Sequence, residues 1–451
     1  MSNYLNAIRG YGTLIISLWF FAESCKNQNM STNTLEKTRS EQWMEDIAFF
    51  ESEFIEQAKT YTDSSRAATK KPLAGLKKAV DELSDLQIQL ELSKAVVMAD
   101  NGHTSLPLPL QERIPLRFYR FSDGIHVVKT DALATPYLGA KLLKVNAMDV
   151  DTVERALFPY VSGTESWKKF KTLGLITAPK ILHALELGKK DSIALRLVKG
   201  KDTLDVTLAA QNVERDRSWF EAWADLYPIQ DEESPWTFLK GKIETHPLYL
   251  KHAEEGVFHT FDEQEKIAYF QINSFWQKCP DIKVSIKVFH EILKTKRDYN
   301  VVFDLRFYTG GNYGVFTQLA TKSPKIINDD QKIFLVLSDK TYSAGIVTAA
   351  RIKHYAKDKL VIVGESVGDR LRFWAEGKAI TLPHSKVKIY SAQKEHDWEH
   401  NKRSFFKTHR ANYLYGVAAK NLDIDQEIKL GFHDYMENND PVWEWIVSQS
   451  R

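Results

Sequence analysis

Three short apolar segments constrain the fold of this chain more than any other feature of its sequence. They comprise residues 301–306, 333–338 and 360–363, and helical patterns separate them. Continuous apolar runs of this kind are typical of strands that are buried on both faces of a parallel sheet. The sequence therefore predicts an α/β core. A crossover helix of that core is marked by apolar residues at helical spacing: Ile282, Ile286, Phe289 and Leu293.

The turns after the first two strands carry residues that suit catalysis. Gly310-Gly311 follows the first strand, and the second strand leads to Ser343 at the start of a helix. Ligands bind at the carboxyl ends of parallel strands, so a serine at this place is a candidate nucleophile. The N–H of Ala344 and a close backbone approach at Gly310 or Gly311 would then stabilise an oxyanion. A helix cap or a tight turn explains either element alone, but their combination on adjacent strands favours a site.

The order of these motifs resembles the core of the tail-specific (C-terminal-processing) serine peptidases and their tricorn-core relatives. The motifs are Asp-Leu-Arg before Gly-Gly-Asn, then Tyr-Ser-Ala-Gly, then Val-Gly-Glu, and the resemblance covers residues 267–440 well. It implies that Ser343 is the nucleophile and that Ala344 with Gly310 or Gly311 forms the oxyanion hole. It also implies the fold: an N-terminal helical segment, a PDZ-like β-rich middle region and a crotonase/ClpP-like ββα core.

The sequence departs from this family at the general base. The processing peptidases use a lysine shortly after the Gly-Glu turn, and here that turn, with Glu365, is followed by Arg370. Arginine stays protonated at any useful pH and cannot accept the proton of a serine. We therefore do not expect a Ser-Lys mechanism. Glu365 is a candidate for lining the pocket, and Arg370 for contacting a substrate carboxylate or positioning another group.

His103 offers another base. Tricorn-type members carry a histidine in a segment like residues 98–104, so the resemblance implies that His103 takes the serine proton near neutral pH. Asp100 and Thr104 are candidates for orienting its imidazole. From the residues alone, the alternative is a histidine that lies favourably at the negative end of a helix.

A second candidate site is the His-x-x-Glu-His pattern of His396, Glu399 and His400. Inverted zinc peptidases place two such histidines on one face of a helix and require a third ligand further along the chain. Here the pattern follows a strand-like segment and lies among charged residues, so a charged loop is the simpler explanation. We expect no metal, and metal-dependent hydrolysis through this segment is the second alternative function.

Composition excludes other classes of function. Hydrophobic residues make up 43% of the 451 residues and aromatic residues 12%, which is typical of a globular chain with large cores. The net charge of +2 comes from nearly balanced acids and bases and gives no electrostatic reason to expect nucleic-acid binding. The sequence has no glycine-rich phosphate loop and no dinucleotide fingerprint, so we expect no cofactor.

The amino terminus has the pattern of an export signal. Arg9 precedes the apolar residues 11–22, a stretch too short for an ordinary membrane-spanning helix. Cys25 follows in a context that resembles a lipoprotein cleavage site, although Glu23 departs from that pattern and leaves simple secretion as the alternative. An acylated Cys25 cannot pair with Cys279, the other cysteine, which we expect to be inert. The expected location is the periplasm, or the outer membrane as a lipoprotein of a Gram-negative bacterium.

The predicted organisation has five parts. They are a signal peptide at residues 1–25, a tether at 26–34, a helical domain at 35–105, a PDZ-like domain at 106–233 and an α/β peptidase core at 234–451.

The expected function is that of an exported serine peptidase acting on polypeptide or peptide substrates. Ser343 would be the nucleophile and His103 the general base. The first alternative is a non-catalytic relative of the same fold that binds a peptide or an apolar ligand. The sequence does not indicate the substrate or the oligomeric state.

Overall fold

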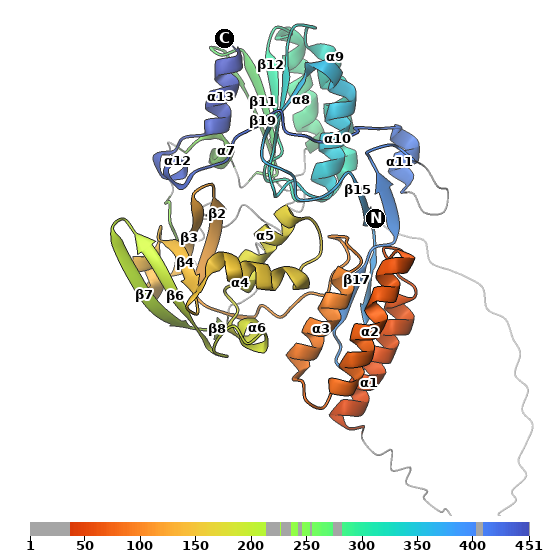
Figure 1. Ribbon diagram of the computed structural model, residues 1–451. Coiled ribbons are helices and arrows are strands. Elements are labelled where there is room, and N and C mark those ends of the chain that lie inside the picture. The colour runs from red at the N-terminus through yellow and green to blue at the C-terminus, as the bar shows by residue number, and fades with distance from the viewer. Residues whose placement is uncertain are drawn as a thin grey trace, which may run out of the picture. The chain divides into compact units, whose positions relative to one another are not determined.

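The computed structural model describes residues 37–212, 226, 236–241, 246–252, 255–273, 282–402 and 409–450. Residues 39–451 form one compact unit, and the account below concerns this unit (Figure 1). The signal segment, the tether, Cys25 and Cys279 lie outside the described residues, and the inferences about them stay predictions. Among the described residues, no helix has the length and apolar character needed to cross a membrane.

The helical segment contains α1 (Arg39–Phe49), α2 (Asp63–Ala79) and α3 (Asp85–Val97). Capping boxes begin α2 and α3, because Thr62 and Ser84 each accept a hydrogen bond from an N–H in the first turn of the helix that follows. A hairpin from the far end of the chain completes the core of this segment. It consists of β16 (Lys378–Thr381) and β17 (Lys388–Ser391).

The middle region is a sheet with the strand order β2-β3-β4-β6-β7, covered on one side by helices. Short strands β5 and β9 pair with β4 and β3, and β1 pairs with β8. The strands are β1 (Glu112–Arg113), β2 (Leu116–Phe121), β3 (Gly124–Asp131), β4 (Lys141–Val145), β5 (Met148–Asp149), β6 (Ser192–Lys199), β7 (Asp202–Ala209), β8 (Gln211–Asn212) and β9 (Trp236–Phe238). The helices are α4 (Val150–Leu157), α5 (Glu165–Leu175) and α6 (Pro179–Ala184).

The α/β core is a six-stranded sheet with the order β10-β11-β12-β13-β14-β19. Strands β11, β12, β13, β14 and β19 run parallel, and β10 is antiparallel to β11. The strands are β10 (Val257–Asp262), β11 (Ile267–Ile272), β12 (Asn300–Asp304), β13 (Ile333–Leu337), β14 (Leu360–Gly364) and β19 (Gln426–Glu427). The three apolar segments of the sequence form β12, β13 and β14, so the predicted α/β fold class is confirmed.

Helices cover both faces of this sheet, which explains why its central strands are apolar without alternation. One face packs against α8 (Ile282–Thr295), α9 (Thr317–Ile326) and α10 (Ala344–Ala356), and the other against α13 (Pro441–Ser450) (Figure 1). On either side of the β16–β17 hairpin in the chain, β15 (Arg372–Ala375) pairs antiparallel with β18 (Lys394–Asp397). The remaining helices are α7 (Leu248–Lys251), α11 (Arg410–Tyr415) and α12 (Phe432–Glu437).

Candidate active site

Ser343 lies at the sharp turn between β13 and α10. Its backbone has φ 52° and ψ −113°, a conformation that costs a non-glycine residue about 1–3 kcal/mol. The turn is held by two hydrogen bonds: Tyr342 N–H donates to Tyr308 O at 3.2 Å, and Gly345 N–H donates to Tyr342 O at 2.8 Å. Residue 345 must be glycine, because a Cβ there would lie 2.3 Å from Tyr308 O. Such a strained, over-determined turn is typical of a functional site.

The glycine turn after β12 lies against this serine. A Cβ built on Gly310 would be 3.4 Å from Ser343 Cβ and 3.7 Å from Ser343 Oγ. Gly310 and Gly311 both have positive φ, at 154° and 120°. Ala344 is the first residue of α10 and is buried. The structure therefore brings Gly310 and Ala344 beside Ser343, which is the arrangement that an oxyanion hole needs.

His103 follows α3, in a loop that the β16–β17 hairpin holds through a pair of hydrogen bonds between Ser105 and Tyr390 (3.1 and 2.8 Å). The imidazole lies between two rings, 4.7 Å from Tyr342 and 5.2 Å from Phe373, nearly parallel to both. Its Nδ1 is 3.1 Å from Tyr342 Oη, while its Nε2 is buried and has no hydrogen-bond partner among the described residues. Since Tyr342 precedes Ser343, the histidine contacts the turn that carries Ser343.

Asp369 is a site residue that the sequence reasoning missed. Its Oδ2 lies 3.5 Å from His103 Nδ1 and has no other partner among the described residues, while its Oδ1 accepts the N–H of Arg370 at 2.9 Å. Burial raises the pKa of Asp369 to about 7, and the backbone N–H and the guanidinium of Arg370 oppose that rise. The sequence did contain a signal for Asp369. The third predicted strand forms β14, and this carboxylate lies in the turn that follows it.

The supporting residues that the sequence suggested have other partners. Asp100 pairs with Arg370, whose guanidinium donates to Asp100 O at 2.9 Å and to Asp100 Oδ1 at 3.0 Å. Thr104 Oγ1 accepts from Asn101 Nδ2 at 3.1 Å, which fixes the loop rather than the imidazole. Burial, together with Asp339, raises the pKa of Glu365 to about 7. The carboxylate aimed at His103 is therefore Asp369.

The imidazole of His103 is part of a continuous column of stacked rings. On one side, Tyr342 stacks on Trp167 of α5 at 3.9 Å. On the other, Phe373 of β15 stacks on His396 of β18 at 4.7 Å, and His396 stacks on His409 at 4.5 Å. Burial and the neighbouring His396 lower the pKa of His103 to about 3, and Glu376 partly offsets this. The column therefore keeps His103 neutral at physiological pH.

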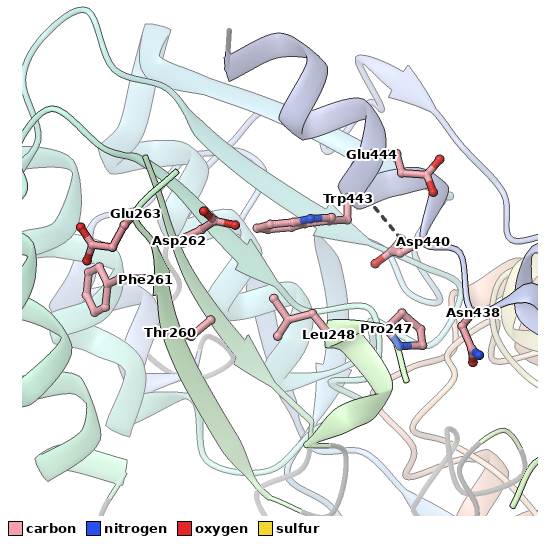
Figure 2. A pocket seen from close by; sticks show the side chains of 10 residues that line it. All are labelled: Pro247, Leu248, Thr260, Phe261, Asp262, Glu263, Asn438, Asp440, Trp443 and Glu444. Carbon is pink, nitrogen blue, oxygen red and sulfur yellow. Dashed lines mark hydrogen bonds between the residues drawn. The ribbon is translucent and has the colours of Figure 1, made fainter. Parts of the chain in front are cut away.

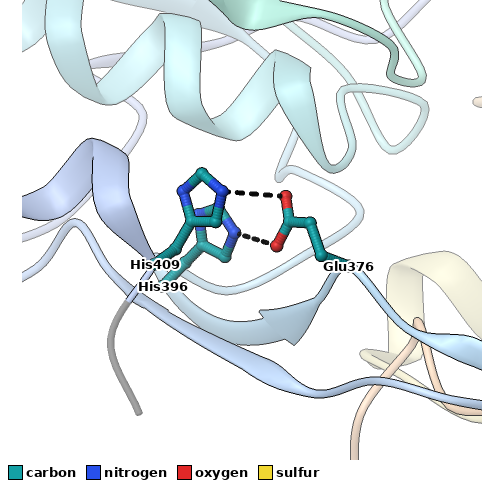
Figure 3. Close-up of side chains that lie close together, drawn as sticks. All are labelled: Glu376, His396 and His409. Atoms are coloured by element: carbon teal, nitrogen blue, oxygen red, sulfur yellow. Dashed lines mark hydrogen bonds and ion pairs between the residues drawn. The ribbon is translucent and has the colours of Figure 1, made fainter. Parts of the chain in front are cut away.

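Glu376, His396 and His409 form the group with metal-ligating side chains among the described residues (Figure 3). Glu376 Oε2 is 2.7 Å from His396 Nε2, and Glu376 Oε1 is 3.7 Å from His409 Nε2. His400 of the predicted zinc pattern is not in this group, because residue 396 lies in strand β18 rather than in a helix. The zinc pattern as predicted is thus not assembled.

The geometry of this group does not suit a shared metal ion. Trp398 Nε1–H donates to His396 Nδ1 at 3.1 Å, so His396 carries its proton on Nε2, the atom that would bind a metal. The rings of His396 and His409 are stacked with an interplanar angle of 12°, and two stacked planes do not meet at one ion. We interpret the group as a carboxylate that accepts a hydrogen bond from His396 and lies within ion-pair distance of His409.

An open pocket of about 610 Å³ lies elsewhere, between the edge strand β10 and α13 (Figure 2). Several of its carboxylates are already paired. Asp440 holds Arg306 through two hydrogen bonds of 3.2 and 2.9 Å, and Glu263 binds Lys296 at 2.7 Å. Its lining contains none of the candidate catalytic residues: it consists of Pro247, Leu248, Thr260, Phe261, Asp262, Glu263, Asn438, Asp440, Trp443 and Glu444.

Comparisons with known proteins give a fold but no close relative. No family model matches this chain, and no curated protein matches its sequence. Mature CPAF aligns with a TM-score of 0.57 at 10% identity, over 91% of this chain and 96% of its own. A point mutant of CPAF aligns with a TM-score of 0.58 at 11% identity, over 91% of this chain and 96% of its own. The photosystem II D1 C-terminal processing protease aligns at 12% identity over 87% of this chain and 93% of its own. Its TM-score of 0.36 is too low to support an argument.

Identities this low show a shared fold and leave the activity open. The chain shares the fold of mature CPAF. The resemblance that the motifs suggested is therefore confirmed for the fold.

Proposed function

We propose that this chain is a serine peptidase in which Ser343, His103 and Asp369 act together. The proposal is supported mainly by the strained Ser343 turn, which lies against Gly310 and carries the ring that stacks on His103. Ionised Asp369 accepts the Nδ1–H of His103, which leaves Nε2 free to act as a base. The substrate class is a polypeptide or peptide.

The reaction follows from these roles. Ser343 Oγ forms a bond to the carbonyl carbon of the scissile peptide, and its proton passes to His103 Nε2. The N–H groups of Ala344 and of Gly310 or Gly311 stabilise the oxyanion. His103 then gives the proton to the amine nitrogen as the C–N bond breaks. A water molecule, deprotonated by His103, releases the acid and restores the serine.

One observation favours the alternative of a non-catalytic binding protein on the same fold. Within the part of the chain that the structure describes, His103 Nε2 has no hydrogen-bond partner, so no hydrogen bond joins it to Ser343. Catalytic hydrogen bonds often tighten only in the complex with substrate, so a chemical test distinguishes the peptidase from the binding protein.

The test is labelling with a fluorophosphonate probe, which reacts with activated serines. We expect the wild-type chain to be labelled at Ser343 and to cleave peptides. Ser343→Ala should lose both properties, with a fall in turnover of about 10³-fold or more. The matched control is Ser366→Ala, an exposed serine in the neighbouring turn, which should change neither. A wild-type chain that is neither labelled nor active across a broad peptide panel would contradict the peptidase proposal and favour the binding alternative.

We also propose that the protein is exported and anchored through Cys25. The proposal rests on the apolar residues 11–22 and the small residues that precede the cysteine. An acyl chain on Cys25 would hold the peptidase at a membrane surface.

A further inference from the structure

A buried lysine joins the Ser343 turn to the β-rich region, and the proposed reaction does not use it. The side chain of Lys340 is 5% exposed and donates to Asp339 Oδ1 at 2.6 Å. Its Nζ lies 4.4 Å from the ring centre of Tyr119 in β2 and 5.6 Å from that of Phe170 in α5. The nucleophile turn thus inserts a cation into an aromatic cage of the middle region.

Stability alone does not account for this lysine. Moving an ammonium out of water costs several kcal/mol, and a buried ion pair is often no more stabilising than apolar side chains of the same volume. Burial opposes the charge of Lys340, but Asp339 raises its pKa above the ordinary value. Lys340 therefore stays protonated and cannot serve as a general base. The charge holds the Lys340 ammonium at a fixed position relative to two rings and the Asp339 carboxylate.

The backbone of the turn makes this contact a rigid one. Ser338 N–H donates to Thr341 Oγ1 at 3.0 Å, and the Thr341 hydroxyl donates to Leu305 O, just beyond β12, at 2.9 Å. Lys340 lies inside this closed turn. The side chain of Lys340 therefore contacts the β-rich region from the same short backbone segment that leads to Ser343.

Helix α5 reinforces the same junction. Trp167 stacks on Tyr342 with an interplanar angle of 9°, and Thr164 Oγ1 donates to Gly368 O at 2.7 Å. Gly368 and Tyr342 directly precede Asp369 and Ser343. The β-rich region thus contacts both turns that carry the proposed catalytic groups.

We propose that Lys340 is a positioning residue, whose cage of Tyr119, Phe170 and Asp339 holds the Ser343 turn in place against His103. The β-rich region is then a structural part of the active site. This inference rests on the proposed peptidase function.

The test replaces the cation while keeping the apolar stem. We expect Lys340→Met to lower kcat by about 10- to 100-fold with KM changed less than about 2-fold, because a small misplacement of a reacting group is enough for such a loss. The pH midpoint of kcat should not move, since no titrating catalytic group is removed. Lys340→Arg, which keeps a cation over the rings, should restore most of the activity.

The matched control is Lys129→Met. Lys129 is also a buried lysine of the β-rich region, with Nζ 5.2 Å from the Trp236 ring and 4.8 Å from the Phe238 ring. We expect it to affect thermal stability but not kcat. Equal losses of kcat in both variants, or wild-type kcat in Lys340→Met, would overturn the proposal.

Hydrogen exchange separates this proposal from the peptidase proposal. In the full-length chain, Lys340→Met should speed amide exchange in residues 338–345 and leave the helical segment unchanged. Unchanged exchange there overturns the anchoring role, whether or not the protein is active. A wild-type chain that the fluorophosphonate does not label refutes the peptidase function instead, and faster exchange in the variant would still support the anchor.

Discussion

At the scale of single residues, the site depends on what burial does to two ionisable groups. Burial lowers the pKa of His103 to about 3 and raises that of Asp369 to about 7. The pKa of His103 therefore lies well below the usual histidine value near 6.5, so the imidazole is neutral near pH 7. Asp369 is the group that titrates, and its protonation state sets the tautomer of the imidazole. Protonated Asp369 donates to Nδ1 and leaves a proton on Nε2, which cannot then accept one from serine.

The ionisation of Asp369 should set the pH dependence of turnover. Turnover should rise with pH through a single group near 7, because ionisation of Asp369 produces the competent tautomer. The free energy of unfolding should change in the opposite direction. The raised pKa of Asp369 in the folded state stabilises that state at a pH below about 4, and this contribution is lost as the pH rises through about 7. Asp369→Asn should lower kcat by about 10³-fold or more and abolish the pH-dependent rise. If the Asp369→Asn variant keeps the rise of turnover with pH, another group is responsible for that rise.

At the scale of elements, the site is built by short segments that contribute one ring each. Trp167 comes from helix α5 and Tyr342 from the turn that carries Ser343. His103 comes from the loop after α3, and Phe373 from strand β15. Stacking on both faces leaves the imidazole only its edges for hydrogen bonds. The paired strands β15 and β18 thus help to build the candidate site, although they contain many polar residues and no motif.

Phe373→Leu tests the contribution of strand β15. Leucine keeps most of the apolar volume but removes the planar ring, so we expect kcat to fall by about 10-fold and stability to fall by about 1–2 kcal/mol. Phe50→Leu is the control, because Phe50 is fully buried in the helical segment, where it stacks on Phe54 at 5.2 Å. It should cost similar stability without changing kcat. A wild-type kcat in Phe373→Leu would show that the ring does not position His103.

At the scale of the whole molecule, the candidate catalytic groups come from distant parts of the chain that fold into one compact unit. His103 follows the helical segment, and Gly310, Ser343 and Asp369 follow successive strands of the α/β core. Arg370 and Asp100 link these two parts directly. The site is therefore complete only when the helical segment packs on the core.

The molecule should not depend on a metal ion. The Trp398 hydrogen bond and the stacked rings of His396 and His409 oppose a shared ion, and His400 lies outside their group. We expect peptidase activity to survive EDTA and 1,10-phenanthroline, and His400→Ala to keep wild-type turnover. Activity that chelators remove and zinc restores would contradict this and favour metal-dependent hydrolysis.

Membrane anchoring is a prediction about the whole chain. We expect the protein in the membrane fraction as a lipidated species whose mature end is Cys25, and Cys25→Ser should release it or block its processing. Cys279→Ser is the control and should leave the location unchanged. A soluble periplasmic form that is cut elsewhere would refute the anchor but not export.

The sequence by itself determined the parallel core and the Ser343 turn, because local residue patterns specify buried strands and tight turns. Runs such as residues 333–337 need only their own apolar side chains to specify a central strand. Tertiary structure decided the rest. Asp369, Lys340 and Phe373 acquire their contacts from segments far away in the sequence, and no local pattern encodes which carboxylate reaches His103. The perturbed pKa values are tertiary for the same reason, since desolvation is a property of the packed core.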